Sequence, residues 1–180
     1  AAGRRVLNAF CYTGGFTLAA LAGGAQSVLS IDSSATALGL GRSSLAMNPA
    51  IAALPAQWKD ADVFAELRAL RNAGATFDLI VLDPPKFAPT AAHAQRAASA
   101  YKDINLLALK LLVPGGLLAT FSCSGGISAE LFRKIVAGAA VDARTDATLV
   151  ATLGASADHP LTLAFPEGEY LKGLLLRKAD

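Results

Sequence analysis

Cysteine is scarce in this chain: its 180 residues include only Cys11 and Cys123, together with two histidines. Two cysteines cannot build a disulfide framework, and the sequence has no cysteine and histidine cluster of the kind that holds zinc. We therefore expect no metal ion and a reducing compartment, the cytoplasm.

Long apolar runs are also missing, because charges and glycines interrupt the alanine-rich segments. No signal peptide is visible, and the first residues run almost directly into a strand, as in a sequence cut from a longer protein. Hydrophobic residues nevertheless make up 53% of the chain, with a mean hydropathy of +0.44. This content predicts a soluble protein that buries its core as one domain and makes no membrane contact.

An excess of charge is absent as well, since the formal net charge is only +2. This value alone does not indicate a nucleic-acid partner, but the distribution of charge is more informative. Between Lys86 and Lys102 the sequence carries Arg96 and His93 and no acid. Such a segment either contacts RNA phosphates or forms an ordinary solvated face.

The apolar pattern predicts alternating strands and helices. We expect strands near residues 6–10, 27–32, 57–59, 78–83, 117–121, 147–153 and 170–177. Helices are expected near 16–22, 34–47, 101–112 and 129–140, and one further helix follows the third strand and ends at residue 71. The last two strands have too little sequence between them for a crossover helix and should pair antiparallel. This order is typical of an α/β, Rossmann-like class I methyltransferase: a mostly parallel seven-stranded sheet with an antiparallel last strand and helices on both faces.

The segment 78–83 is an unbroken β-favouring run that ends in Asp83-Pro84-Pro85. Prolines stop a central strand, and in open α/β sheets ligands bind at the carboxyl ends of the strands. We expect the Asp83 carboxylate to stand at this edge on a stiff exit from the strand.

The first strand leads into Cys11-Tyr12-Thr13-Gly14-Gly15, which lacks the Gly-x-Gly-x-x-Gly pattern of dinucleotide enzymes. Asp32 ends the second strand, where a carboxylate can accept two ribose hydroxyls or merely cap the next helix. Asp62 falls where an adenine amino group would lie, although Asp60 is adjacent.

Six motifs together resemble the catalytic domain of bacterial 23S ribosomal RNA cytosine-5 methyltransferases of the large-subunit methyltransferase I type. These motifs are Asn8–Phe16, Asp83–Phe87, Tyr101–Asn105, Ser122–Gly125, Asp158–Pro160 and Pro166–Gly173. The resemblance covers essentially residues 1–180 and implies S-adenosylmethionine as the cofactor and 23S ribosomal RNA as the partner. Members of that family also carry an amino-terminal PUA domain and a linking segment, which are absent from this chain.

The chemistry implied by the resemblance needs a thiolate, because carbon 5 of cytosine becomes nucleophilic only after a thiolate adds to carbon 6. Cys123 is the candidate nucleophile, with Asp83 on the N3/N4 edge of the base and Lys86 supplying positive charge. We expect Lys86 and the backbone N–H groups after Ser124 to lower the pKa of the Cys123 thiol.

The same resemblance assigns the remaining site residues. The cofactor would be bound by Phe10, Tyr12, Thr13, Gly14, Phe16, Asp32, Ser33, Asp62, Val63 and Asp83. The RNA would be bound by Pro84, Lys86, Phe87, Arg96, Tyr101, Lys102, His159 and Lys172.

Alternatives remain open at this stage. Cys123 can be a buried, inert thiol, as we expect for Cys11, and Tyr101 can pack in the core rather than stack on a base. The enzyme can act on a base nitrogen, or the chain can be a non-catalytic module that binds S-adenosylmethionine and RNA. The apolar content also permits a homodimer, but no stretch identifies an interface, and the sequence does not indicate which cytidine is modified.

Overall fold

The computed structural model describes residues 1–88, 94–156, 159–160, 162–165, 168 and 170–180. His93, Asp158, Pro166, Glu167 and Glu169, which belong to the basic segment or the motifs above, lie outside these residues. Within the described part, no helix is both long and apolar enough to cross a bilayer.

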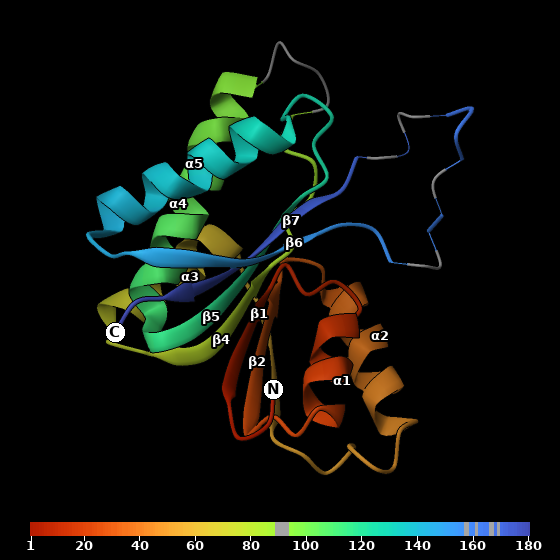
Figure 1. Cartoon of the computed structure of the whole chain (residues 1–180). Helices are drawn as coiled ribbons and strands as arrows, with labels where there is room; N and C mark the ends of the chain where they lie inside the picture. Colours follow the sequence, from red (N-terminus) through yellow and green to blue (C-terminus); the bar gives the residue numbers. More distant parts are fainter. Residues whose placement is uncertain (89–93, 157–158, 161, 166–167, 169) are drawn as a thin grey trace.

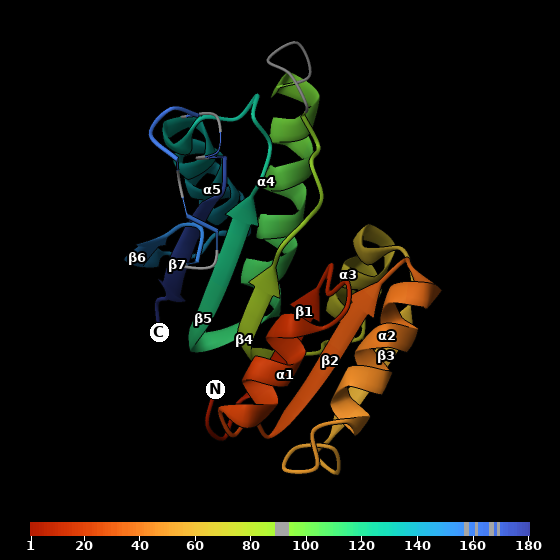
Figure 2. The same cartoon turned by 90° about the vertical axis from the view of Figure 1, so that its right-hand side faces the viewer.

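A seven-stranded sheet forms the centre of the molecule, with the order β3-β2-β1-β4-β5-β7-β6. The strands are β1 (Arg5–Ala9), β2 (Ser27–Asp32), β3 (Ala56–Asp60), β4 (Phe77–Leu82), β5 (Leu112–Ser122), β6 (Ala147–Leu153) and β7 (Lys172–Lys178). The first five are mutually parallel, and β7 lies antiparallel between β5 and β6. Figure 2 shows the carboxyl ends of the parallel strands gathered at one edge of the sheet.

In the part of the chain that the structure describes, five helices cover the two faces of the sheet: α1 (Gly15–Ala22), α2 (Ala35–Ala46), α3 (Val63–Asn72), α4 (Ala94–Leu111) and α5 (Ala129–Ala143). Helices α1 and α2 lie on one face, and α3, α4 and α5 lie on the other (Figure 1). The predicted fold class, including the antiparallel last pair, is therefore confirmed.

The strands explain this layering, because neighbouring side chains point to opposite faces. Leu7 and Ile80 belong to the large core shared with α3, α4 and α5. Val6 and Val28 belong to the smaller core under α1. Burial on both faces is why the parallel strands read as continuous apolar runs.

Two predicted boundaries were wrong. Helix α4 begins at Ala94 rather than near Tyr101. The alanines of residues 94–100 favour helix, but these residues lack the apolar stripe on which the prediction was based. Strand β5 begins at Leu112 rather than near Leu117, and it includes Pro114-Gly115-Gly116. Gly115 has φ +71° there, and the pairing with β4 shifts register between Phe77 and Leu79, so the strand bends without ending.

Candidate functional site

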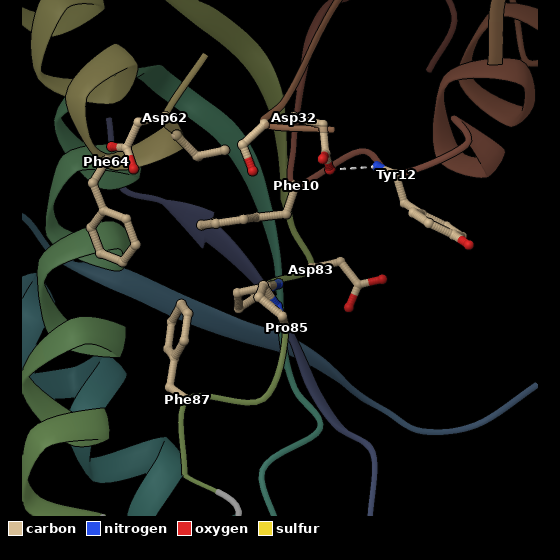
Figure 3. Close-up of a pocket in the computed structure, with 11 residues that line it drawn as sticks. Phe10, Tyr12, Asp32, Asp62, Phe64, Asp83, Pro85 and Phe87 are labelled. Atoms are coloured by element: carbon tan, nitrogen blue, oxygen red, sulfur yellow. Dashed lines mark hydrogen bonds between the residues drawn. The ribbon is translucent and has the colours of Figure 1, made fainter. Parts of the chain in front are cut away.

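A cavity of about 410 Å³ opens at the carboxyl ends of β1, β2 and β4. Its lining is aromatic and acidic (Figure 3) and comprises Phe10, Tyr12, Asp32, Ser33, Asp62, Val63, Phe64, Asp83, Pro84, Pro85 and Phe87. We call this space the first cavity. Its volume falls within the roughly 300–1,000 Å³ of small-molecule sites.

Asp32 is held rigidly at the end of β2. One carboxylate oxygen accepts the backbone N–H of Tyr12 at 2.8 Å, the bond drawn in Figure 3, and the other accepts that of Ser34 at 2.9 Å. The cap of α2 is Ser34, whose hydroxyl accepts the N–H of Ala37 at 3.2 Å. The helix-cap alternative for Asp32 is therefore wrong, and its remaining lone pairs are available to a ligand.

Asp62 lines the first cavity from the start of α3, whereas Asp60 is the last residue of β3 and does not line it. One oxygen of Asp62 caps α3 by accepting the N–H of Ala65 at 2.8 Å. Its other oxygen makes no bond to the helix. The backbone N–H groups of Val63 and Phe64, in the first turn of α3, have no partner within the helix either. This end of the cavity therefore offers both an acceptor and donors.

The turn between β1 and α1 is strained. Phe10 and Tyr12 have φ values of 61° and 48°, in the left-handed region that side chains rarely adopt. Gly14 has φ +81°, and a Cβ there would lie 2.4 Å from the Trp58 ring, so only glycine fits. Strain of this kind persists where the surrounding structure enforces it, often beside ligands.

Three residues predicted at the cofactor site stand back from the first cavity. Thr13 and Gly14 belong to the turn but are not part of its lining, and neither is Phe16. The Phe16 ring stacks on Phe121 with centroids 5.7 Å apart. Conversely, Phe64 and Pro85 line the first cavity although the sequence did not indicate them. Phe87, predicted to bind the substrate, also lines the first cavity.

A second cavity, of about 470 Å³, lies against the first. Its lining comprises Asp83, Cys123, Ala155, Ser156, His159, Pro160, Gly168, Tyr170 and Leu171. We call this space the thiol cavity. Asp83 lines both cavities, so one carboxyl group stands where they meet.

Cys123 is half-buried at the end of β5, and its sulfur lies 3.7 Å from the carbonyl oxygen of Pro84. Burial and the negative charge of Asp83 raise the pKa of the thiol, and its own backbone N–H, Lys86 and Lys172 offset this only partly. The predicted lowering of the Cys123 pKa is therefore wrong, because desolvation outweighs the two ammonium groups.

The other titrating groups contrast with Cys123. Cys11 is buried, and this burial together with Asp32 raises its pKa to about 12, which leaves it a protonated packing thiol. Burial also raises the pKa of Asp83, so this carboxyl takes up a proton more readily than a solvated one. Asp83 thus has an environment suited to donating a proton.

The predicted RNA-binding cations occupy different surroundings. Lys86 is exposed, with its ammonium 5.3 Å from the centre of the Tyr170 ring, and Arg96 is exposed on α4. Lys102 forms a 2.8 Å ion pair with Asp142, which ties α4 to α5. Lys86 and Arg96 are therefore the exposed lysine and arginine of the predicted set, whereas Lys102 and Lys172 are half-buried.

Lys172 and Tyr101 both contact Ser124, and neither lines the first cavity or the thiol cavity. Lys172 donates to the Ser124 carbonyl oxygen at 2.7 Å. Tyr101 has no exposed surface, and its hydroxyl lies 2.9 Å from the Ser124 hydroxyl. A ring without an exposed face cannot stack on a base, so the substrate-binding prediction for Tyr101 is wrong and the core-packing alternative is right.

Of the remaining predicted substrate residues, His159 lines the thiol cavity, and Pro84 is largely buried and lines the first cavity. Tyr170 was missed, although it stands in the motif that supplied Lys172. Among the described residues, no three histidine, cysteine or acidic side chains gather as a metal ion would require.

Comparison with known proteins relates both the sequence and the fold of this chain to methyltransferases. A family model described as S-adenosylmethionine-dependent methyltransferase matches residues 1–148. Ribosomal RNA large subunit methyltransferase I from Aeromonas hydrophila and from Tolumonas auensis are each 51% identical over 97% of this chain. The chain spans 44% of the length of each of these relatives.

A similar solved structure, of a protein complexed with SAH, superposes with a TM-score of 0.82 at 24% identity. The match covers 98% of this chain and 46% of that one. At this identity the likeness supports the fold alone.

Proposed function

The chain belongs to the family of S-adenosylmethionine-dependent methyltransferases, and from this premise we propose that it methylates carbon 5 of a cytidine in 23S ribosomal RNA. The reaction proceeds through a covalent adduct between Cys123 and carbon 6 of the base. The observation that carries the proposal is the position of Asp83, which lines both the first cavity and the cavity that holds the Cys123 thiol.

The first cavity fits S-adenosylmethionine, the family's cofactor. Asp32 retains lone pairs for the two ribose hydroxyls, and Asp62 with the N–H of Val63 matches an adenine edge. Phe10 and Phe64 supply apolar walls for the adenine ring. The bound cofactor supplies an electrophilic methyl group on a sulfonium.

The protein residues divide the work at the base. The Cys123 thiolate forms a bond to carbon 6, and the displaced electron pair moves through C4 to N3, which takes a proton from Asp83, whose pKa is raised. Asp83 is left as a carboxylate, and carbon 5 of the resulting enamine takes the methyl group. Loss of the carbon 5 proton to a base then expels the Cys123 thiolate from carbon 6, and N3 returns its proton to Asp83 as 5-methylcytosine is released.

Formation of the thiolate is the demanding step, because the pKa of Cys123 is raised. Lys86 and Lys172 lower this pKa, although less than burial and Asp83 raise it. Proton transfer to Asp83 would remove its opposing negative charge, so protonation of Asp83 and ionisation of Cys123 favour each other.

A nitrogen target fits the thiol cavity less well. Enzymes that methylate base nitrogens from an Asp/Asn-Pro-Pro exit place an aromatic ring directly after the prolines, where this chain has Lys86. Phe87 follows one residue later, and its ring packs on Tyr101 at 4.8 Å and lines the first cavity. A nitrogen target would also leave Cys123 without a role.

The RNA partner is proposed from the names of the relatives and from the exposed Lys86 and Arg96. We extend the same proposal to a cytoplasmic location, to an additional PUA domain in the full-length protein and to a homodimer. These points remain predictions.

The test uses RNA containing 5-fluorocytidine. Fluorine at carbon 5 cannot leave as a cation, so an enzyme that forms the Cys123 adduct stalls with the RNA covalently attached. We expect the full-length protein, given S-adenosylmethionine and large-subunit ribosomal RNA with this base, to form a complex that survives denaturation.

The matched variants are Cys123→Ala and Cys11→Ala. Cys123→Ala should lose both the complex and methylation, whereas Cys11→Ala should retain both, because Cys11 only packs against its neighbours. Methylation without a trapped complex, or normal turnover by Cys123→Ala, would exclude the adduct and favour a nitrogen target.

A further inference from the structure

Ser124 follows Cys123 directly and is fully buried, yet its hydroxyl contacts three polar groups. The backbone N–H groups of Phe87 and Ala88 each donate to its oxygen at 3.1 Å, and the Tyr101 hydroxyl lies 2.9 Å away. The carbonyl oxygen of Ser124 accepts the ammonium of Lys172 at 2.7 Å. Both the side chain and the main chain of this residue are therefore held.

Counting donors shows how the hydroxyl is used. A serine hydroxyl has one proton and two lone pairs, and two backbone N–H groups already occupy the lone pairs. The serine proton is consequently directed to the Tyr101 oxygen. Ala88, Tyr101 and Ser124 have no exposed surface, so solvent cannot replace the hydroxyl if it is removed.

The hydroxyl joins the walls of the two cavities. Phe87 belongs to the exit of β4 and lines the first cavity, while Cys123 belongs to the exit of β5 and lines the thiol cavity. The thiol contacts the same β4 exit through the Pro84 carbonyl at 3.7 Å. Tyr101 anchors this junction to α4, and its ring packs on Phe87 with centroids 4.8 Å apart.

We propose that Ser124 is a positioning residue: its buried hydroxyl pins the β4 exit against the β5 exit and thereby fixes the Cys123 sulfur relative to the cofactor cavity. This role rests on the proposed function, because the position of the sulfur matters only if the sulfur attacks the base. Misplacement of reacting groups by about 1 Å can cost 10²-fold in rate. We expect its loss to slow the chemical step and to leave cofactor binding unchanged, because Ser124 bonds Phe87 only through its backbone N–H, while the Phe87 ring is held by Tyr101.

The experiment compares Ser124→Ala with Tyr101→Phe and with the control Ser128→Ala in the full-length protein. Ser128 is a matched serine on the same segment, where its hydroxyl accepts one backbone N–H, that of Leu131 at 3.1 Å, as the cap of α5. Its removal weakens a helix cap without touching either cavity exit. Steady-state kinetics, cofactor binding and 5-fluorocytidine trapping are measured for each.

We expect Ser124→Ala to lower kcat by about 10- to 100-fold and to slow trapping in proportion, with the KM for S-adenosylmethionine unchanged. Tyr101→Phe should lose less, because Ser124 still accepts both N–H groups. Ser128→Ala should lower thermal stability while leaving kcat unchanged. Should Ser124→Ala fail to fold, Tyr101→Phe carries the test through the same split between kcat and KM.

Wild-type kcat in Ser124→Ala, or an equal loss of kcat and cofactor affinity in Ser124→Ala and Tyr101→Phe, would overturn the positioning role. If the wild-type protein itself traps no RNA, the proposed function fails instead. The role of Ser124 is then decided by a crystal structure of Ser124→Ala. The distance from the Cys123 sulfur to the Pro84 oxygen should exceed the present 3.7 Å, and an unchanged distance would refute the pin.

Discussion

The two cavities that meet at Asp83 are built in different ways. The first cavity takes its polar groups from residues at or just beyond strand ends, such as Asp32 after β2 and Asp62 after β3. The thiol cavity takes only Asp83 and Cys123 from strand ends, and the rest of its lining comes from the segment between β6 and β7. The sheet therefore dictates the proposed cofactor site, whereas a connecting segment shapes most of the proposed substrate site.

The largest effect should follow from damage to the first cavity alone. Asp32→Ala removes the acceptor for a bound ribose and for the N–H groups of Tyr12 and Ser34. Because hydrogen bonds to charged groups contribute about 1.5–3 kcal/mol each, affinity for S-adenosylmethionine should fall by about 100-fold or more. Calorimetric titration measures this loss.

Asp60→Asn is the control, since Asp60 pairs with Asp32 in the sheet register but lies outside the lining. The alkylation rate of Cys123 should stay the same in both variants. Equal affinity of the two variants for S-adenosylmethionine would show that Asp32 does not bind the cofactor.

The converse change damages only the thiol cavity. Tyr170→Ala removes an exposed aromatic ring that lines this cavity. Because a stacked base is worth about 1–3 kcal/mol, the KM for RNA should rise by roughly tenfold while cofactor affinity stays constant. Filter binding with labelled RNA provides an independent measurement.

Phe165→Ala is the matched aromatic control, because Phe165 is exposed on the same segment but does not line the thiol cavity. If both variants lose RNA affinity to the same extent, the ring at position 170 has no special role.

A smaller effect should come from Asp83, which belongs to both cavities. The pKa of Cys123 is raised partly by the Asp83 charge, so little thiolate exists at neutral pH and its fraction grows as the pH rises. Asp83→Asn should lower this pKa and accelerate alkylation of Cys123 at neutral pH by roughly threefold. Methylation should nevertheless fall, because the proton donor to N3 is lost.

The pH profile of iodoacetamide modification, recorded in the Cys11→Ala background, measures the change. Lys86→Gln should shift the profile in the opposite direction, since Lys86 lowers the pKa of Cys123. A profile that does not move in either variant would mean that these charges do not reach the thiol.

The smallest expected effect is on stability. The pKa of Asp83 is raised above 3.8 in the folded chain, so the folded state holds this proton more tightly than the unfolded state. The resulting stability is present below the unfolded-state pKa and is lost as the pH rises through the folded-state pKa. Asp83→Asn should therefore raise the melting temperature at neutral pH by about 1 °C at most, because Asp83 is exposed and solvent screens its charge.

Thermal melts across the acidic range test this sign. The advantage of Asp83→Asn should disappear toward low pH, where the wild-type carboxyl is protonated. A lower melting temperature at neutral pH would show that the Asp83 carboxylate stabilises the fold.

The strands, the antiparallel last pair and the acids at strand ends could be predicted from the sequence, because burial on both faces leaves continuous apolar runs with Asp32 and Asp83 at their ends. Asp32 and Asp62 line the first cavity as predicted, because both stand at the carboxyl end of a strand or just beyond it. Helix α4 was placed too late, because its first turns carry alanine and polar residues without an apolar period.

Other features depend on tertiary contacts that a local pattern does not contain. The lowered pKa expected for Cys123 was wrong because the depth of its burial depends on how the β4 and β5 exits meet. Tyr101 is inaccessible for the same reason, since α4 turns it toward Ser124. Phe64 lines the first cavity because α3 starts immediately after Asp62, a boundary that a sequence pattern locates only loosely.

The reversed direction of β7 has an evolutionary consequence. Because β6 and β7 are adjacent antiparallel strands, the described residues between them lie at the edge of the sheet where the thiol cavity opens, outside the strand pairings. Exchange of that single stretch would leave donor capture and every strand pairing intact. Under the proposed function, a lineage that exchanged this stretch would change the nucleotide it modifies while inheriting the cofactor site unaltered.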